Sequence, residues 1–236
     1  MALMHFMRDV ERLRRLFLAL FSRVEEALGR GIRAFVEQDA ELAARVIAED
    51  REIDTAEVEV EEEVLKILAL HQPVAQDLRY LVSLLKINRD LERIGDQAVA
   101  VAEVTQRLNA QARGQVPPAL LALMDRAVAM LRQAFDALIR LDVERARQVW
   151  AGDDEADDLA RAAVAAIQDE IRRAPHRAPV LMELHELAAV VERIADHSAN
   201  VAKDVLYVVT GEIVRHRGRE FKTPPAAAPA APPPAA

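Results

Sequence analysis

The chain has no cysteine and is poor in aromatic residues and glycine. The absence of cysteine from all 236 residues excludes disulfides, thiolate metal ligands and cysteine nucleophiles. Only 4% of the residues are aromatic and seven are glycine, while alanine, leucine and valine dominate a hydrophobic content of 52%. This composition favours helices over sheets, because strands prefer β-branched and aromatic side chains.

Long apolar runs and an excess of basic residues are also missing. The first residues, "MALMHFMRDVERLRRLF", meet a charge every few positions, unlike the apolar core of a signal peptide. No uncharged run approaches the roughly 20 apolar residues that span a membrane. The formal net charge of −8 argues against a nucleic-acid partner. We therefore expect a cytoplasmic protein that neither binds nucleic acid nor inserts into a membrane.

Helical periodicity runs through almost the whole chain and predicts an all-α fold. Asp39 and Asp142 are expected to be N-caps, because a short carboxylate can accept a hydrogen bond from the free N–H groups of a first turn. Prolines near positions 73, 117 and 179 are expected in first turns, where the missing N–H costs little. Six helices of roughly 25–40 residues with short connections predict antiparallel bundles. The breaks fall at Gln38–Asp39, His71–Pro73, Gly114–Pro118, Leu141–Asp142 and Pro175–Pro179.

The six predicted helices form two sets of three related by an internal duplication. "DAELAARVIAEDREID" from Asp39 aligns without gaps onto "DVERARQVWAGDDEAD" from Asp142, an offset of 103, with eight identical residues. The segment E-R-I-x-D occurs at Glu92 and again at Glu192, an offset of 100. Nearly equal offsets on different helices indicate a repeated three-helix unit.

This duplication divides the chain into three predicted regions. We expect one three-helix repeat over residues 1–112, a second over residues 113–216, and a disordered Pro/Ala-rich tail over residues 217–236. The last part of the tail, "KTPPAAAPAAPPPAA", cannot pack a core.

Each E-R-I-x-D segment carries an acid pair that a helix brings together. Glu92 and Asp96 lie one turn apart, as do Glu192 and Asp196, so the like charges repel. On a helical wheel both pairs interrupt apolar stripes, where ionised carboxylates need a counter-charge or a metal. The stripe positions are Val74, Leu78, Leu81, Leu85, Asn88 and Val99 for the first pair, and Leu181, His185, Ala188 and Ala199 for the second.

The preceding helix of each repeat supplies two further acids at the same spacing. Asp50 and Asp54 precede the first pair, and Asp153 and Asp157 are their counterparts in the second repeat. If these helices pack together, each repeat gathers four carboxylates. Such an all-oxygen cluster suits cations such as Mg, Ca, Mn or ferric iron.

Three other interpretations remain open. The second-helix acids can form a solvated acidic turn. Arg93 and Arg193 can neutralise the pairs of a purely structural bundle, although they point roughly 100° away from the glutamates and fit less well than a metal. The chain can also be a carboxylate-bridged metalloenzyme or metal-storage protein. The Glu-x-x-His motif of such di-iron sites is absent, and His185 and His197 lack counterparts in the first repeat, so we expect no enzyme.

Two long segments resemble the signature helices of the PhoU family of phosphate-transport accessory and signalling proteins. They read "QPVAQDLRYLVSLLKINRDLERIGDQA" from Gln72 and "ERIADHSANVAKDVLYVVTGE" from Glu192, and the resemblance covers roughly residues 5–215. It implies a cytoplasmic protein of two three-helix repeats, often a homodimer, with acid pairs that hold multinuclear metal clusters. It also implies a regulator linking the Pst phosphate importer, through its ATPase subunit, to a sensor histidine kinase. Such a regulator represses the phosphate-starvation response when phosphate is plentiful.

The resemblance carries the family's metal motifs onto residues of both repeats, and the expected metal is Fe, Zn, Mn or Mg. Ala100 stands where the second repeat has Asn200, and Gln97 stands where the family often has histidine. We therefore expect the second site to be the better formed. The implied metal ligands are Asp50, Asp54, Glu92, Asp96, Asp153, Asp157, Glu192, Asp196 and Asn200.

Overall fold

The computed structural model describes residues 2–111 and 114–214, and this part of the chain is helical with no strand. The all-α prediction is confirmed, although α4 is slightly shorter than expected. The elements are α1 (Ala2–Glu37), α2 (Ala40–His71), α3 (Ala75–Asn109), α4 (Pro118–Arg140), α5 (Val143–Arg173), the short 3-10 helix η1 (Pro175–Arg177) and α6 (Ala178–Thr210).

Local side-chain chemistry starts α2 and α5 where the sequence predicts it. Asp39 accepts a hydrogen bond from the backbone N of Leu42 at 2.9 Å, and Asp142 accepts one from Arg145 at 3.0 Å. Both predicted N-caps are confirmed. The expected first-turn position of Pro73 is wrong, because α3 begins at Ala75 with Val74 as its N-cap residue.

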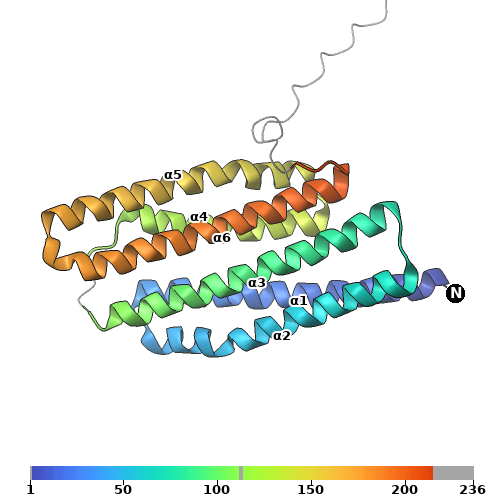
Figure 1. The fold of residues 1–236 in the computed structure, drawn as a ribbon, viewed down its shortest axis with the longest axis horizontal. Helices are drawn as coiled ribbons and strands as arrows, with labels where there is room; N and C mark the ends of the chain where they lie inside the picture. The colour runs from blue at the N-terminus through green and yellow to red at the C-terminus, as the bar shows by residue number, and fades with distance from the viewer. Residues whose placement is uncertain (1, 112–113, 215–236) are drawn as a thin grey trace, which may run out of the picture.

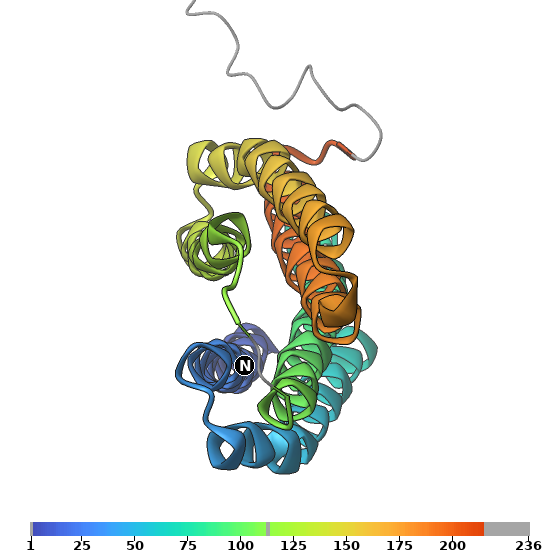
Figure 2. The same cartoon turned by 90° about the vertical axis from the view of Figure 1, so that its left-hand side faces the viewer.

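The helices form two three-helix bundles that lie side by side (Figures 1 and 2). Helices α1, α2 and α3 pack on one another, as do α4, α5 and α6, and the bundles meet where α3 runs along α6. The duplicated architecture predicted from the two offsets is confirmed.

Contacts along α3 and α6 show that the two helices are antiparallel. From one end to the other, Lys86 binds Asp204, Asp90 binds His197, and Arg107 binds Glu183. A single hydrophobic cluster extends through both bundles, from Leu13 of α1 to Val214. The two repeats therefore share one core.

The buried side of α3 matches the predicted stripe only in part, since Leu81 and Asn88 are buried as expected. Leu84, Ile87 and Leu91 are buried, whereas Val74 is 73% exposed and Leu78 is 41% exposed. Glu92 and Asp96 are half-buried, so the acid pair of α3 lies beside the core rather than within it. The reason is that α3 packs against both its own bundle and α6, which widens the buried face of the helix, while Val74 and Leu78 lie at its N-terminal end.

Two further predictions meet the limits of the described residues. The boundary expected at 112–113 and the tail over 217–236 lie outside them. Among the described helices, none combines the length and the apolar character needed to cross a membrane.

Candidate functional site

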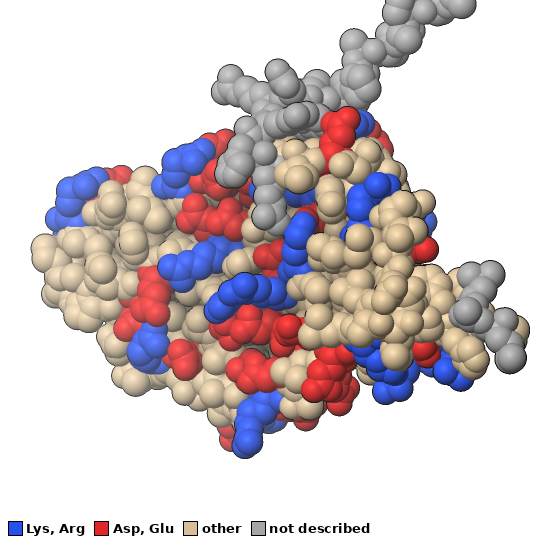
Figure 3. Space-filling view, turned by 45° about the vertical axis from the view of Figure 1, so that its right-hand side comes forward, with Lys and Arg blue, Asp and Glu red and all other residues tan. Residues whose placement is uncertain are grey.

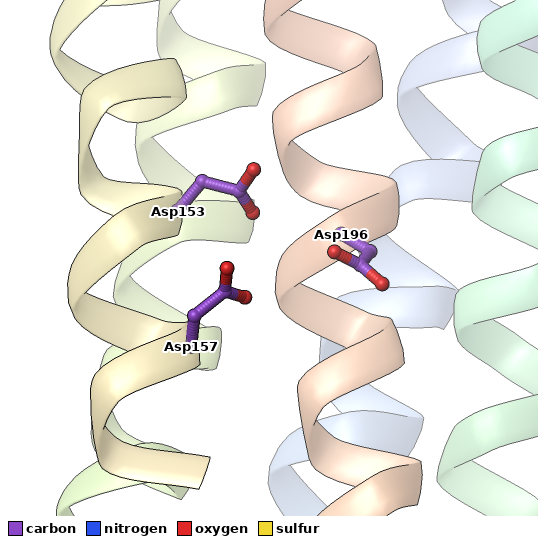
Figure 4. Close-up of side chains that lie close together, drawn as sticks. All are labelled: Asp153, Asp157 and Asp196. Atoms are coloured by element: carbon purple, nitrogen blue, oxygen red, sulfur yellow. The ribbon is translucent and has the colours of Figure 1, made fainter. Parts of the chain in front are cut away.

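Three carboxylates from two helices of the second repeat meet in one place. Asp153 and Asp157 lie one turn apart on α5, and Asp196 faces them from α6 (Figure 4). One carboxylate oxygen from each residue lies within 4.8 Å of the others. The i, i+4 spacing aligns the two α5 aspartates, and the packing of α5 on α6 supplies the third.

The local electrostatics disfavour additional negative charge at this cluster. Partial burial raises the pKa of Glu192, and the charges of Asp157 and Asp196 raise it further. Burial and the charge of Asp157 likewise raise the pKa of Asp196, although Asp196 is the most exposed of the three clustered acids. The Oδ1 atom of Asp153 is buried. A cation placed here would relieve both the repulsion and the desolvation cost.

Basic side chains lie near the second-repeat cluster. The charge of Arg161, and then that of Arg193, lowers the pKa of Glu192, although Arg193 forms no ion pair within the described residues. Lys203 donates a hydrogen bond to Asn200 at 3.2 Å and lies over the ring of Trp150. Asn200, which the resemblance implies is a metal ligand, is therefore held by a lysine in this structure.

The first-repeat acids also face one another, but an arginine reaches them. The pKa of Asp50 is raised by burial and then by the charges of Asp54 and Asp96. Burial and the charge of Asp96 raise the pKa of Glu92. Arg93 lies 3.4 Å from a Glu92 oxygen and 3.2 Å from an Asp96 oxygen.

This contact shows that Arg93 reaches both acids of the first pair, as the interpretation of an arginine-neutralised bundle requires. The backbone does direct successive side chains about 100° apart, but the long, flexible stem of an arginine spans that angle. The two repeats therefore differ: the first pair has an arginine partner, whereas the second lies in a cluster of three aspartates.

Sequence reasoning missed Glu57 and Glu61 in the first repeat. Asn88 donates a hydrogen bond to the Glu57 side chain at 2.9 Å, and burial followed by the charge of Glu61 raises the pKa of Glu57. Glu57 follows Asp50 by two helical turns, so helical periodicity could have found it. The duplication concealed it, because Ala160 stands at the equivalent position. Both glutamates line a cavity of about 350 Å3 with Leu85, Arg89, Glu92 and Arg93.

The histidine next to Asp196 connects the two bundles. Nδ1 of His197 lies 2.8 Å from an Asp90 oxygen across the α3–α6 contact. His185, the other histidine near the second acid pair, is half-buried on α6. The described residues thus offer a carboxylate donor set, which suits hard or borderline cations such as Mg, Mn or ferric iron.

Comparison with known proteins identifies the family. Residues 17–105 and 120–205 each match the PhoU domain. The chain belongs to the PhoU family. The two matched segments fall within the first and second bundles, so the family domain occurs once per bundle.

PhoU proteins from several bacteria resemble the chain over most of its length. The phosphate-specific transport system accessory protein PhoU homolog of Pseudomonas putida is 32% identical, with 92% of this chain and 86% of the relative covered. The PhoU homolog of Clostridium acetobutylicum is 29% identical, with coverage of 89% and 96%. The crystal structure of PhoU from Pseudomonas aeruginosa matches with a TM-score of 0.83 at 30% identity, covering 88% of this chain and all of that one.

Proposed function

We propose that this PhoU-family protein is a non-enzymatic regulator of phosphate uptake and phosphate-starvation signalling. The observation that carries the proposal is the match of both bundles to the PhoU domain, together with relatives named as accessory proteins of phosphate-specific transport. The protein would act in the cytoplasm, where an importer exposes its ATPase subunit, by binding partners through its helical surfaces.

In this proposal the protein links the ATPase subunit of the Pst importer to a sensor histidine kinase. It represses the starvation response when phosphate is plentiful, and it functions as a homodimer. A bundle built around one continuous core supports this role, because a rigid surface binds partners at a low conformational cost.

A reporter of the phosphate-starvation response tests the regulatory role. Deleting the gene should switch the reporter on in high phosphate, and a plasmid copy of the gene should switch it off again. A reporter that stays off in the deletion strain would show that the protein is not the repressor. A kinase-deficient deletion strain provides the control, since the reporter should remain off there.

We further propose that Asp153, Asp157 and Asp196, with Glu192 beside them, hold a metal ion or a multinuclear cluster of Fe, Zn, Mn or Mg. The carboxylate donors and the burial at the cluster support this assignment. A bound metal would supply positive charge that joins α5 to α6. Elemental analysis of untagged protein tests the site: metal should be present in stoichiometric amounts, and a chelator should lower the melting temperature.

A further inference from the structure

The two equivalent helices α1 and α4 differ in length, which leaves a step between the bundles. Helices α1 and α4 are antiparallel, since Arg132 binds Glu25 at 2.6 Å and the ring of Phe135 stacks on that of Phe21. Beyond this contact α4 ends at Arg140, whereas α1 continues back to Ala2. The N-terminal end of α1 therefore projects past the second bundle (Figure 1).

A mostly apolar cavity of about 280 Å3 lies at this step. Met7 on α1 is 60% exposed, and Ile139 and Leu141 at the end of α4 are each 37% exposed. The face of the molecule drawn in Figure 3 carries both acidic and basic side chains and, next to them, an area without charged side chains. We use the name α1–α4 step for this cavity and the exposed helix ends around it. The cavity is lined by Met7, Val10, Glu11, Arg14, Phe17, Leu18, Tyr80, Leu138, Ile139 and Leu141.

Leu141 occupies a backbone conformation that does not favour leucine. Its φ of 51° lies in the left-handed region, at a helix C-cap where glycine is usual. The first repeat places Gln38 at the equivalent position, with a φ of 57° and an exposed polar side chain. The fold therefore accepts a polar residue here. An exposed leucine in a strained conformation indicates a role in binding rather than in folding.

The charged residues at and beside the α1–α4 step are mostly basic, in a chain whose net charge is −8. One acid, Glu11, and one base, Arg14, line the cavity, and Arg15 and Arg140 are exposed close to it in the sequence. None of these three arginines forms an ion pair with a described residue. A two-fold contact between copies would bring two arginine-rich rims together, so a second copy is a poor occupant.

We propose that the α1–α4 step binds an amphipathic helix of a partner protein, with an apolar stripe in the cavity and acidic flanks against Arg14 and Arg140. A helix in a groove is a recurring mode of recognition, with anchors at i, i+3, i+4 and i+7. The proposal rests on the proposed regulatory function only in that a regulator must bind a partner. Its test uses purified protein, so it can fail while the reporter experiment succeeds.

Two fluorescein-labelled helical peptides test the proposal on the full chain by fluorescence anisotropy. Both carry leucines at i, i+3, i+4 and i+7, and one has glutamate flanks while the other has lysine flanks. The glutamate peptide should bind at least about tenfold more tightly than the lysine peptide. Arg14→Glu with Arg140→Glu should reverse this preference. Arg33→Glu with Arg45→Glu changes the net charge equally, on exposed positions away from the step, and should preserve it.

Leu141→Gly separates binding from folding. Glycine adopts the left-handed conformation without steric strain, so the melting temperature should not fall. Affinity for the glutamate peptide should drop about tenfold, because the leucine side chain is lost. Absent or equal binding of the two peptides, or a preference that survives the double charge reversal, would overturn the proposal. So would a change in oligomeric state of the Leu141→Gly variant in sedimentation, which would assign the step to a contact between copies.

Discussion

At the scale of single residues, the acid pairs of the two repeats have different charged neighbours. In α3, Arg93 contacts both acids of its E-R-I-x-D segment. In α6, Asp196 faces Asp153 and Asp157, and the equivalent Arg193 forms no ion pair within the described residues. The charges of Arg161 and Lys203 lower the pKa values of Glu192 and Asp196, respectively, and a bound cation would offset the repulsion that remains.

Replacing the second acid pair tests this difference. Glu192→Gln with Asp196→Asn should lower the amount of bound metal and leave the helix content unchanged. In chelator the variant should be as stable as the parent or more stable, by a few tenths of a kcal/mol, because the i, i+4 repulsion is gone. Elemental analysis and thermal melts with and without chelator measure both effects.

The raised pKa values of Glu192 and Asp196 give the pH dependence of this effect. The folded state binds these protons more tightly than the unfolded state, so stability is lost as pH rises through the unfolded and then the folded pKa values. The advantage of the variant should therefore be largest at neutral pH and disappear below about pH 4.

The first acid pair provides the matched control. Glu92→Gln with Asp96→Asn removes both partners of Arg93, so any gain in chelator should be smaller and the loss of metal less. The metal sites would be ruled out if the parent protein contains no Fe, Mn, Zn or Mg and its melting temperature does not change in chelator. A bundle neutralised by arginine would then be the better account.

At the scale of helices, both repeats begin their second helix in the same way. Asp39 has φ −91° and ψ 96°, and Asp142 has φ −87° and ψ 101°. Each carboxylate accepts a hydrogen bond from the backbone N three residues later. These caps are local, which explains why the sequence located them.

Removing either cap should have the same effect. Asp39→Ala and Asp142→Ala should each cost about 1 kcal/mol, because a first-turn N–H group loses its acceptor. The melting temperature should fall by about 2–4 °C in each case. Asp125→Ala, at an exposed position within α4, is the control and should change stability by less than about 0.5 kcal/mol. Cap variants that melt like this control would contradict the assignment.

At the scale of the molecule, the bundles share a core and a row of polar contacts between α3 and α6. Lys86 binds Asp204 at 3.3 Å at one end of this contact, and Arg107 binds Glu183 at 2.7 Å toward the other. Unfolding one repeat would expose the face of α3 or α6 that the other repeat buries. The repeats should therefore unfold together.

Trp150 makes this cooperativity measurable. It is the only tryptophan and lies in the second repeat, so its fluorescence reports on that repeat, whereas far-ultraviolet circular dichroism reports on both. The two signals should give the same melting midpoint. A fluorescence midpoint that differs from the circular dichroism midpoint would show that the repeats unfold separately.

The sequence by itself determined the features that depend on neighbouring residues. Helical periodicity, the caps at Asp39 and Asp142 and the duplication follow from spacing along the chain, and so does the alignment of Asp153 with Asp157 on one face. Each depends on contacts within a few turns of one helix, or on comparing the two repeats.

Only the tertiary structure decided which helix faces meet and what the long side chains reach. The packing of α3 against its own bundle and α6 widened its buried face to include Leu84, Ile87 and Leu91, and it placed His197 beside Asp90. The sequence also did not predict that Arg93 contacts both Glu92 and Asp96, or that the α1–α4 step exists beyond the end of α4. Helical spacing fixes where a side chain leaves its backbone, but its partner depends on packing between residues far apart in the chain and on the rotamer it adopts.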